Sequence, residues 1–276
     1  MGMFAFITGW AFALHKEKSL SWVTVKVIDF YKRYWISFIF LLLFSLGVCN
    51  YRPSIIDIIK EATGLFNELM KFCWYVPFYV TSLFLMYFLY HQMDRSVVYS
   101  FVFGIIVPVI GFSIIEKVVP VDLMAELANH LKHFFPCVAV GYICNRYNVF
   151  GILQSYIWKA NPWAIFLASF IVVFVGRYYF RAMDFLYAPI IVLGISNLVQ
   201  REKKSKCWKL FEQILILIGK QSTNMWFLHC AIFSSVTSSY IQPYVYWSAN
   251  PLIVFACTVT ILYVLSYFLS VIDKKF

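Results

Sequence analysis

Long apolar stretches, separated by short polar connections, run through this chain and limit what it can fold into. Of its 276 residues, 62% are hydrophobic and only 13% are charged, whereas a soluble domain has about 25% charged residues. The stretches are continuous and do not alternate between apolar and polar positions, which favours membrane-spanning helices over barrel strands. The sequence therefore predicts an all-α fold, a polytopic membrane helix bundle.

The apolar stretches predict about nine transmembrane helices, although the first is shorter than the roughly 17–25 residues that a crossing needs. The mixed-charge loop over residues 50–71 is expected to contain an amphipathic segment, and Leu210–Ile218 is expected to form a separate interfacial helix. The nine expected spans are Met3–Leu14, Tyr34–Val48, Cys73–Tyr90, Val97–Ile115, Leu131–Cys144, Pro162–Val175, Phe185–Val199, Ser222–Tyr240 and Leu252–Val271.

The net charge of +10 comes from lysines and arginines beside the expected spans. In a soluble protein this charge would suggest nucleic acid, but here it follows the positive-inside rule, so no nucleic-acid partner is expected. Alternation of the spans puts the basic loops 15–33 and 201–209 in the cytoplasm, together with the turn at Asp94, the loop 145–159 and the C-terminus. The same basic face would also attract anionic lipid headgroups or an anionic cofactor.

Two arginines on the outer side, Arg177 and Arg181, break this trend. Cations on the disfavoured side can hold a carboxylate or a sugar acid, and the alternative is a surface ion pair with Asp184. Nine spans with a cytoplasmic C-terminus also put Met1 outside. One further helix is therefore expected before Met1.

The run Gly219–His229 carries the most chemical information, because an ionisable group inside an apolar helix is expensive in lipid and is a candidate functional group. Ser222 and His229 are seven residues apart, so a helix puts them on one face. The alternatives are a histidine that packs against a neighbouring helix and a serine that caps a helix N-terminus.

Other polar residues indicate less. The seven cysteines show no metal-ligand spacing and are interpreted as reduced, small apolar residues. His130 and His133 have i,i+3 spacing, but no carboxylate or cysteine completes a ligand set, so no metal is expected.

Several segments resemble, in order along the chain, those of the membrane-bound acyltransferase 3 family, whose members O-acylate bacterial surface polysaccharides. The stretch ending at His229 is similar to the family's late GK-x-S-T-x-x-W-x-x-H segment and is the most specific of them. Weaker similarities are FAFITGW at 4–10, FYKRYW at 30–35, Trp74–Tyr79, the segment from Pro136 to Phe150, and Asp184–Pro189.

Two departures from the family pattern matter. The family's first helix, which carries the histidine taken as its catalytic base, has no counterpart here, and Asp29 stands where the family usually has a basic residue. We therefore expect residues 1–276 to form a single integral-membrane acyltransferase-like domain that is incomplete at its N-terminus. The complete family fold would have ten transmembrane helices.

The resemblance implies an enzyme of the bacterial cytoplasmic membrane. It would move an acyl group, in the expected form acetyl, from cytoplasmic acyl-CoA to a hydroxyl of a cell-surface glycan or its lipid-linked precursor. His229 would act as a base, an acyl relay or an orienting donor, with a supporting role favoured, and Ser222 is the nearest hydroxyl on its face.

The donor and acceptor would meet different groups. The phosphates of acyl-CoA would meet the cations on the inner face, and the glycan would meet polar and aromatic groups. The expected donor-binding residues are Lys26, Lys32, Arg33 and Lys220, and the expected acceptor-binding residues are Arg177, Arg181, Asp184 and Trp226.

Two alternatives stay open at this stage. The chain could be an inactive family remnant that lacks its base. It could also be a multi-pass transporter or flippase for polysaccharide precursors, although the spans show no internal repeat.

Overall fold

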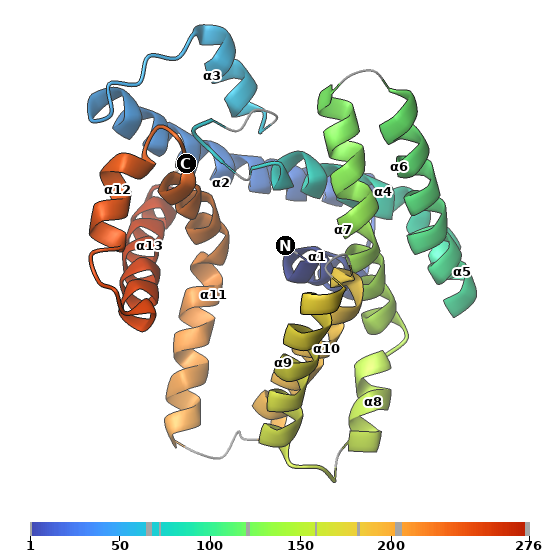
Figure 1. Ribbon diagram of the computed structural model, residues 1–276. Coiled ribbons are helices and arrows are strands. Elements are labelled where there is room, and N and C mark those ends of the chain that lie inside the picture. The colour runs from blue at the N-terminus through green and yellow to red at the C-terminus, as the bar shows by residue number, and fades with distance from the viewer. Residues whose placement is uncertain are drawn as a thin grey trace. The chain divides into compact units, whose positions relative to one another are not determined.

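The computed structural model describes residues 2–64, 68–71, 73–119, 122–157, 159–180, 183–201 and 206–273, and Figure 1 shows their arrangement into helices. All regular secondary structure within these ranges is helical, which confirms the predicted all-α class. The chain divides into two compact units. The first unit comprises Met1–Val23 and Phe78–Lys209, and the second comprises Thr24–Pro77 and Leu210–Phe276. The single domain expected from the sequence stays a prediction.

Three helices in the described ranges are long and apolar enough to cross a membrane. They are Val97–Val118, which combines α5 (Val97–Phe101), η1 (Val102–Ile106) and α6 (Val107–Val118), then α9 (Pro162–Tyr179) and α13 (Pro251–Asp273). The helix α1 (Gly2–Leu14) is apolar but shorter. These helices coincide with four of the nine expected spans, and the number nine is not confirmed.

The first unit is organised around α7 (Asp122–Arg146), which crosses α1 at very short distance (Figure 1). A Cβ atom added at Gly9 would lie 1.8 Å from the carbonyl oxygen of Val138. A Cβ atom at Gly141 would lie 2.0 Å from the carbonyl oxygen of Phe6. Each backbone therefore occupies the space that a side chain of the other helix would need, and only glycine fits at either position.

Other helices of the first unit pack around this crossing. Phe6 stacks on Phe150, and a Cβ atom on Gly194 would lie 2.2 Å from the Ser169 hydroxyl oxygen. The helices concerned are α4 (Tyr75–Met93, most of it in this unit), α8 (Val149–Ile157), α9 and α10 (Asp184–Arg201).

A single wide turn, η1, interrupts the Val97–Val118 helix. Pro108 has no backbone N–H, and its ring would clash with the carbonyl of Gly104 in a regular α-helix. The backbone N–H of Val107 instead donates to the carbonyl of Val102, five residues back, which is the π-helical pattern. The proline thus explains where the helix widens.

Polar contacts show which loops of the first unit share an end. The Arg146 Nε lies 2.7 Å from the Asp94 Oδ1, and the Tyr142 hydroxyl donates to the same oxygen at 2.6 Å. The hydrogen bond with Asp94 raises the pKa of Arg146 further. The turn at Asp94 and the loop 145–159 therefore lie at one end of the unit, as the alternation of spans predicts.

The second unit contains α3 (Ile55–Ala62), α12 (Ser238–Val245), α13 and most of α2 (Leu20–Gly47) and α11 (Lys206–Phe233), whose first four residues belong to the first unit. A reciprocal capping box between Ser54 and Asp57 starts α3, whose isoleucines Ile55, Ile56 and Ile59 are exposed. This helix is the amphipathic segment expected in the loop 50–71. The core residues of the unit come mainly from α2, α11 and the segment before α4, and include Tyr34, Phe38, Leu69, Met70, Cys73, Phe227, Leu228 and Cys230.

Two expectations about the Gly219–His229 region are wrong. Leu210–Ile218 is not a separate helix, because α11 runs without a break from Lys206 to Phe233. Gly219 lies in open space inside this helix, and an isolated glycine is tolerated there. Ser222 is therefore an interior helical residue and not an N-cap.

The expected span Ser222–Tyr240 is also interrupted. The helix α11 ends at Phe233, and α12 begins at Ser238. Between them, the Ser234 hydroxyl donates to the carbonyl of Glu68 at 2.8 Å, and the Thr237 hydroxyl donates to the carbonyl of Ala231. Both hydroxyls are buried, so they stabilise a break that the apolar pattern does not reveal.

We predict that Gly141→Ala destabilises the first unit by about 2–3 kcal/mol or more, because its Cβ would force the two backbones apart. The matched control is Gly111→Ala in α6, where an added Cβ meets nothing within 4 Å. That change should gain up to about 1 kcal/mol of helix propensity. Thermal unfolding in detergent, followed by circular dichroism, measures both. Equal midpoints for the two variants would contradict the close crossing.

Candidate functional site

His229 lies half-buried in the last two turns of α11, and its ring is held by the backbone of its own helix. The Nδ1 atom forms a short hydrogen bond with the carbonyl oxygen of Trp226. A carbonyl can only accept, so this contact requires the proton on Nδ1. In the neutral ring the lone pair is then on Nε2, which is the arrangement that a proton acceptor needs.

Aromatic side chains surround this histidine. The ring centroids of Trp226 and Phe233 each lie 6.0 Å from that of His229. Trp226 in turn packs edge-on against Tyr75 at 5.2 Å. The expected acceptor-binding residue Trp226 therefore lies beside His229 and is fixed in place by the start of α4.

Two buried thiols meet beside this histidine, and no sequence pattern predicts their contact. The Cys230 Sγ lies 4.0 Å from the His229 Nδ1 and 3.9 Å from the Cys73 Sγ, although the two cysteines are 157 residues apart. Neither thiol is exposed. Because Nδ1 already carries a proton for the carbonyl of Trp226, it is not placed to accept the proton of Cys230.

Ser222 lies seven residues before His229 on the same continuous helix, as expected. Its hydroxyl donates to the carbonyl of Gly219 at 2.8 Å, which is a local bond inside the helix. Its oxygen can still accept a hydrogen bond. Lys220, two residues before Ser222, is exposed.

Lys32 and Arg33 on α2 meet the C-terminal end of α13. The Lys32 Nζ lies 3.2 Å from Asp273 Oδ1 and donates to the Asp273 carbonyl oxygen at 3.1 Å. The Arg33 Nε lies 3.9 Å from Asp273 Oδ2. Their side chains are 40% and 46% exposed, so both can still reach a ligand in solvent. Lys26, also on α2, is exposed, and the sequence did not predict the role of Asp273.

The other expected acceptor-binding residues belong to the first unit. The Arg177 Nη1 lies 3.6 Å from Asp184 Oδ1, which is the ion pair weighed as the alternative from the sequence. Asp184 stands in the first turn of α10, where a negative charge is favoured by the helix dipole. Arg177 is 61% exposed on its side chain, and Arg181 lies outside the described residues.

A buried carboxylate, Glu61 at the end of α3, organises the segment that leads to Cys73. Its Oε1 accepts the backbone N–H groups of Glu68 at 2.6 Å and Leu69 at 2.8 Å, and its Oε2 accepts that of Met70 at 3.4 Å. The Tyr34 hydroxyl donates to the carbonyl of Glu61. Burial raises the pKa of Glu61 above its usual value, although the three N–H groups act in the opposite direction.

The chain matches no protein-family model, no curated protein and no solved structure. Function is therefore inferred from the residues and contacts of this chain. The second unit holds most of the expected site residues: His229, Ser222, Trp226, Lys26, Lys32, Arg33 and Lys220.

We predict that Glu61→Ala destabilises the second unit by about 2 kcal/mol or more, because it leaves three N–H groups without an acceptor, two of them on the buried residues Leu69 and Met70. Glu61→Gln keeps one acceptor oxygen and should cost less. Thermal unfolding in detergent compares the two variants with the wild type. A smaller loss for alanine than for glutamine would contradict the role of the carboxylate as an acceptor.

The same residue gives a pH dependence with a definite sign. Because folding raises the pKa of Glu61, the neutral acid is favoured in the folded state. The free energy of unfolding should therefore fall as the pH rises through that pKa, and this fall should be absent in Glu61→Gln. The exposed Asp57 is the control, since hydrogen bonds from Ser54 lower its pKa and its contribution is lost on acidification. Unfolding midpoints across the range from about pH 4 to 8 measure both.

Proposed function

We propose that this protein is a membrane O-acyltransferase, which moves an acyl group from acyl-CoA to a hydroxyl of a cell-surface glycan or its lipid-linked precursor. The observation that carries the proposal is the hydrogen bond from His229 Nδ1 to Trp226, because it fixes the neutral tautomer whose Nε2 bears the lone pair that a proton acceptor needs. Acyl transfer to a sugar needs a group that accepts the hydroxyl proton or orients the hydroxyl.

The donor side of the proposal uses the cations of the second unit. Lys32 and Arg33 present two adjacent, half-exposed charges, and both face the carboxylate of Asp273, the one ion-pair partner they have among the described residues. The phosphates of CoA would compete with that carboxylate for the same ammonium and guanidinium groups. Lys26 and Lys220 would add to the positive potential.

The acceptor side uses aromatic and polar groups. Trp226 lies beside His229, and its indole is the kind of ring on which a sugar would stack. Arg177 with Asp184 offers an exposed guanidinium for an acidic sugar in the first unit. We also propose that the protein crosses the bacterial cytoplasmic membrane nine times and has its C-terminus in the cytoplasm. The three long apolar helices and the basic loops support this topology.

We predict that His229→Ala lowers acyl transfer by about a hundredfold or more at unchanged protein level, because a group that accepts or donates the proton contributes at least about this factor. The control is His91→Ala, since His91 is exposed at the end of α4. Transfer of labelled acetyl from acetyl-CoA to the glycan fraction of native membranes measures the activity. Equal activity of the two variants would make His229 a packing residue.

The wild-type membranes in this assay also separate the alternatives. An inactive remnant would incorporate no label above membranes that lack the protein. A transporter or flippase for precursors would move glycan without acylating it. Either result would reject the acyltransferase proposal.

We predict that replacing both Lys32 and Arg33 with alanine raises the KM for acetyl-CoA about threefold to tenfold, because each exposed charge contributes modestly. The complementary variant is Asp273→Asn, which removes the competing carboxylate and should lower KM. Initial rates against acetyl-CoA concentration measure both changes. An altered topology with unchanged KM would show that these residues serve only orientation in the membrane.

A further inference from the structure

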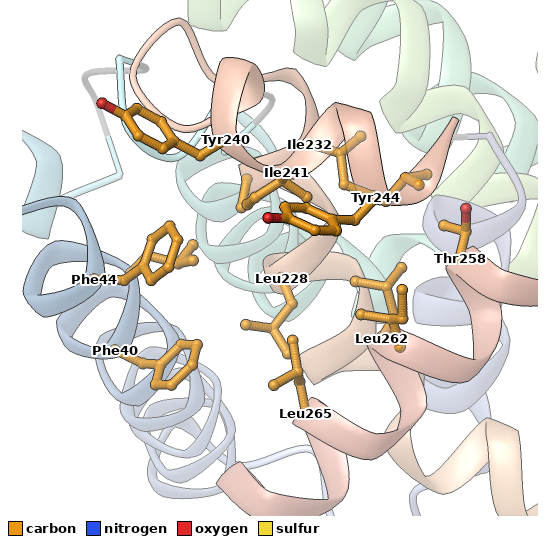
Figure 2. Close-up of a pocket in the computed structure, with 14 residues that line it drawn as sticks. Phe40, Phe44, Leu228, Ile232, Tyr240, Ile241, Tyr244, Thr258, Leu262 and Leu265 are labelled. Carbon is orange, nitrogen blue, oxygen red and sulfur yellow. The ribbon is translucent and has the colours of Figure 1, made fainter. Parts of the chain in front are cut away.

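The second unit contains an apolar cavity of about 320 Å³ between α2, α11, α12 and α13. Figure 2 shows side chains from these helices around it, among them Phe40, Phe44 and Leu228. The walls include Leu228 but not His229, so the cavity is beside the candidate site and is not part of it.

The lining offers almost no polar group to a ligand. The Thr258 hydroxyl donates to the carbonyl of Val254 at 2.7 Å and is already satisfied. Figure 2 shows the Tyr244 hydroxyl directed among the labelled side chains and the Tyr240 hydroxyl directed away from them. The cavity is open where Tyr244, 75% exposed, forms its edge, and a lining with so few polar groups is unsuited to charged ligands.

Size and shape favour a hydrocarbon chain. An apolar cavity of about 150 Å³ holds one benzene molecule, so this volume has room for roughly twelve carbon atoms. On α13 the lining extends from Thr258 to Leu265, which corresponds to about 10 Å along the helix. A cavity that follows a helix for two turns fits an extended alkyl chain.

The surroundings of the cavity indicate the source of this alkyl chain. The helix α13 is one of the helices long and apolar enough to cross a membrane. Its residues Phe255 and Val264, outside the cavity, are 68% and 59% exposed, which suits contact with lipid. An unfilled void forfeits dispersion contacts on every wall, and the nearest hydrocarbon for such a helix is a lipid tail.

We propose that this cavity binds one acyl chain of a membrane lipid. The Tyr244 hydroxyl provides a hydrogen-bonding group near the chain, and tyrosines favour positions with one apolar and one polar side. The site is separate from the acyltransferase proposal, since it requires neither acyl-CoA nor His229.

The test uses the full chain in lipid nanodiscs that contain phosphatidylglycerol with a photoreactive diazirine midway along one acyl chain. After illumination, mass spectrometry maps the labelled peptides. We expect adducts on the cavity side of α12 and α13, at or beside Ile241, Leu262 and Leu265. Adducts only at outward residues such as Phe255 would overturn the proposal.

Matched variants on one helix sharpen the result. Ile261→Trp places an indole at the cavity wall, where the residue is 39% exposed and has room to change. Val264→Trp places the same side chain on the exposed surface of α13 outside the lining. The cavity adducts should be lost in the first variant and kept in the second. Equal cavity labelling of the two variants would reject the site.

Two further arms keep the test decisive. If Ile261→Trp loses its helical circular dichroism, Ala231→Leu replaces it as the test variant. This change fills the cavity from α11 with a group smaller than an indole, and it should also abolish the adducts. A photoreactive free fatty acid provides the last comparison. Cavity labelling by the fatty acid alone, and not by the lipid, would identify a detached chain and overturn the proposal.

Discussion

The need to satisfy backbone polar groups inside the chain itself underlies this structure. Few charged side chains are present, and the backbone N–H and C=O groups are paired within helices. Hydroxyls such as those of Ser113 and Thr258 donate hydrogen bonds to carbonyls of the same helix. Where the backbone leaves the helix after α3, the carboxylate of Glu61 accepts three N–H groups. A buried acid is thus retained because it replaces the acceptors that a helix would supply.

Close backbone contact supplies the second principle. The crossing of Gly9 and Gly141 lets α1 lie directly against α7, and contacts of this kind replace the hydrophobic driving force that lipid would remove. In the second unit, the aromatic side chains of Tyr34, Trp226 and Phe227 fill the space instead. The ring of His229 is consequently fixed by neighbours on its own helix and by packing that begins at Tyr75.

The sequence predicted what depends on local patterns and missed what depends on distant contacts. The all-α class, the amphipathic α3 and the shared end of Asp94 and Arg146 follow from periodicity and alternation of polar segments. The interior position of Ser222 was missed because the polar run from Lys220 to Asn224 resembles the entry to a helix, and the break after Phe233 depends on buried hydroxyls. The meetings of Cys73 with Cys230 and of Lys32 with Asp273 join residues far apart in the chain, so no pattern signals them.

The wide turn η1 makes the packing of the Val97–Val118 helix sensitive to the addition or loss of a single residue. A π-helical turn holds one residue more than an α-helical turn, so it rotates α6 relative to α5 by about 100° compared with a regular helix. Gly104, inside that turn, faces Ala139 so closely that an added Cβ would lie 2.8 Å from the Ala139 Cβ. An insertion or deletion of one residue between Val102 and Ile106 would therefore turn a different side of α6 toward α7. A change in the length of this helix keeps the contact with α7 only if it also restores the original rotation of α6.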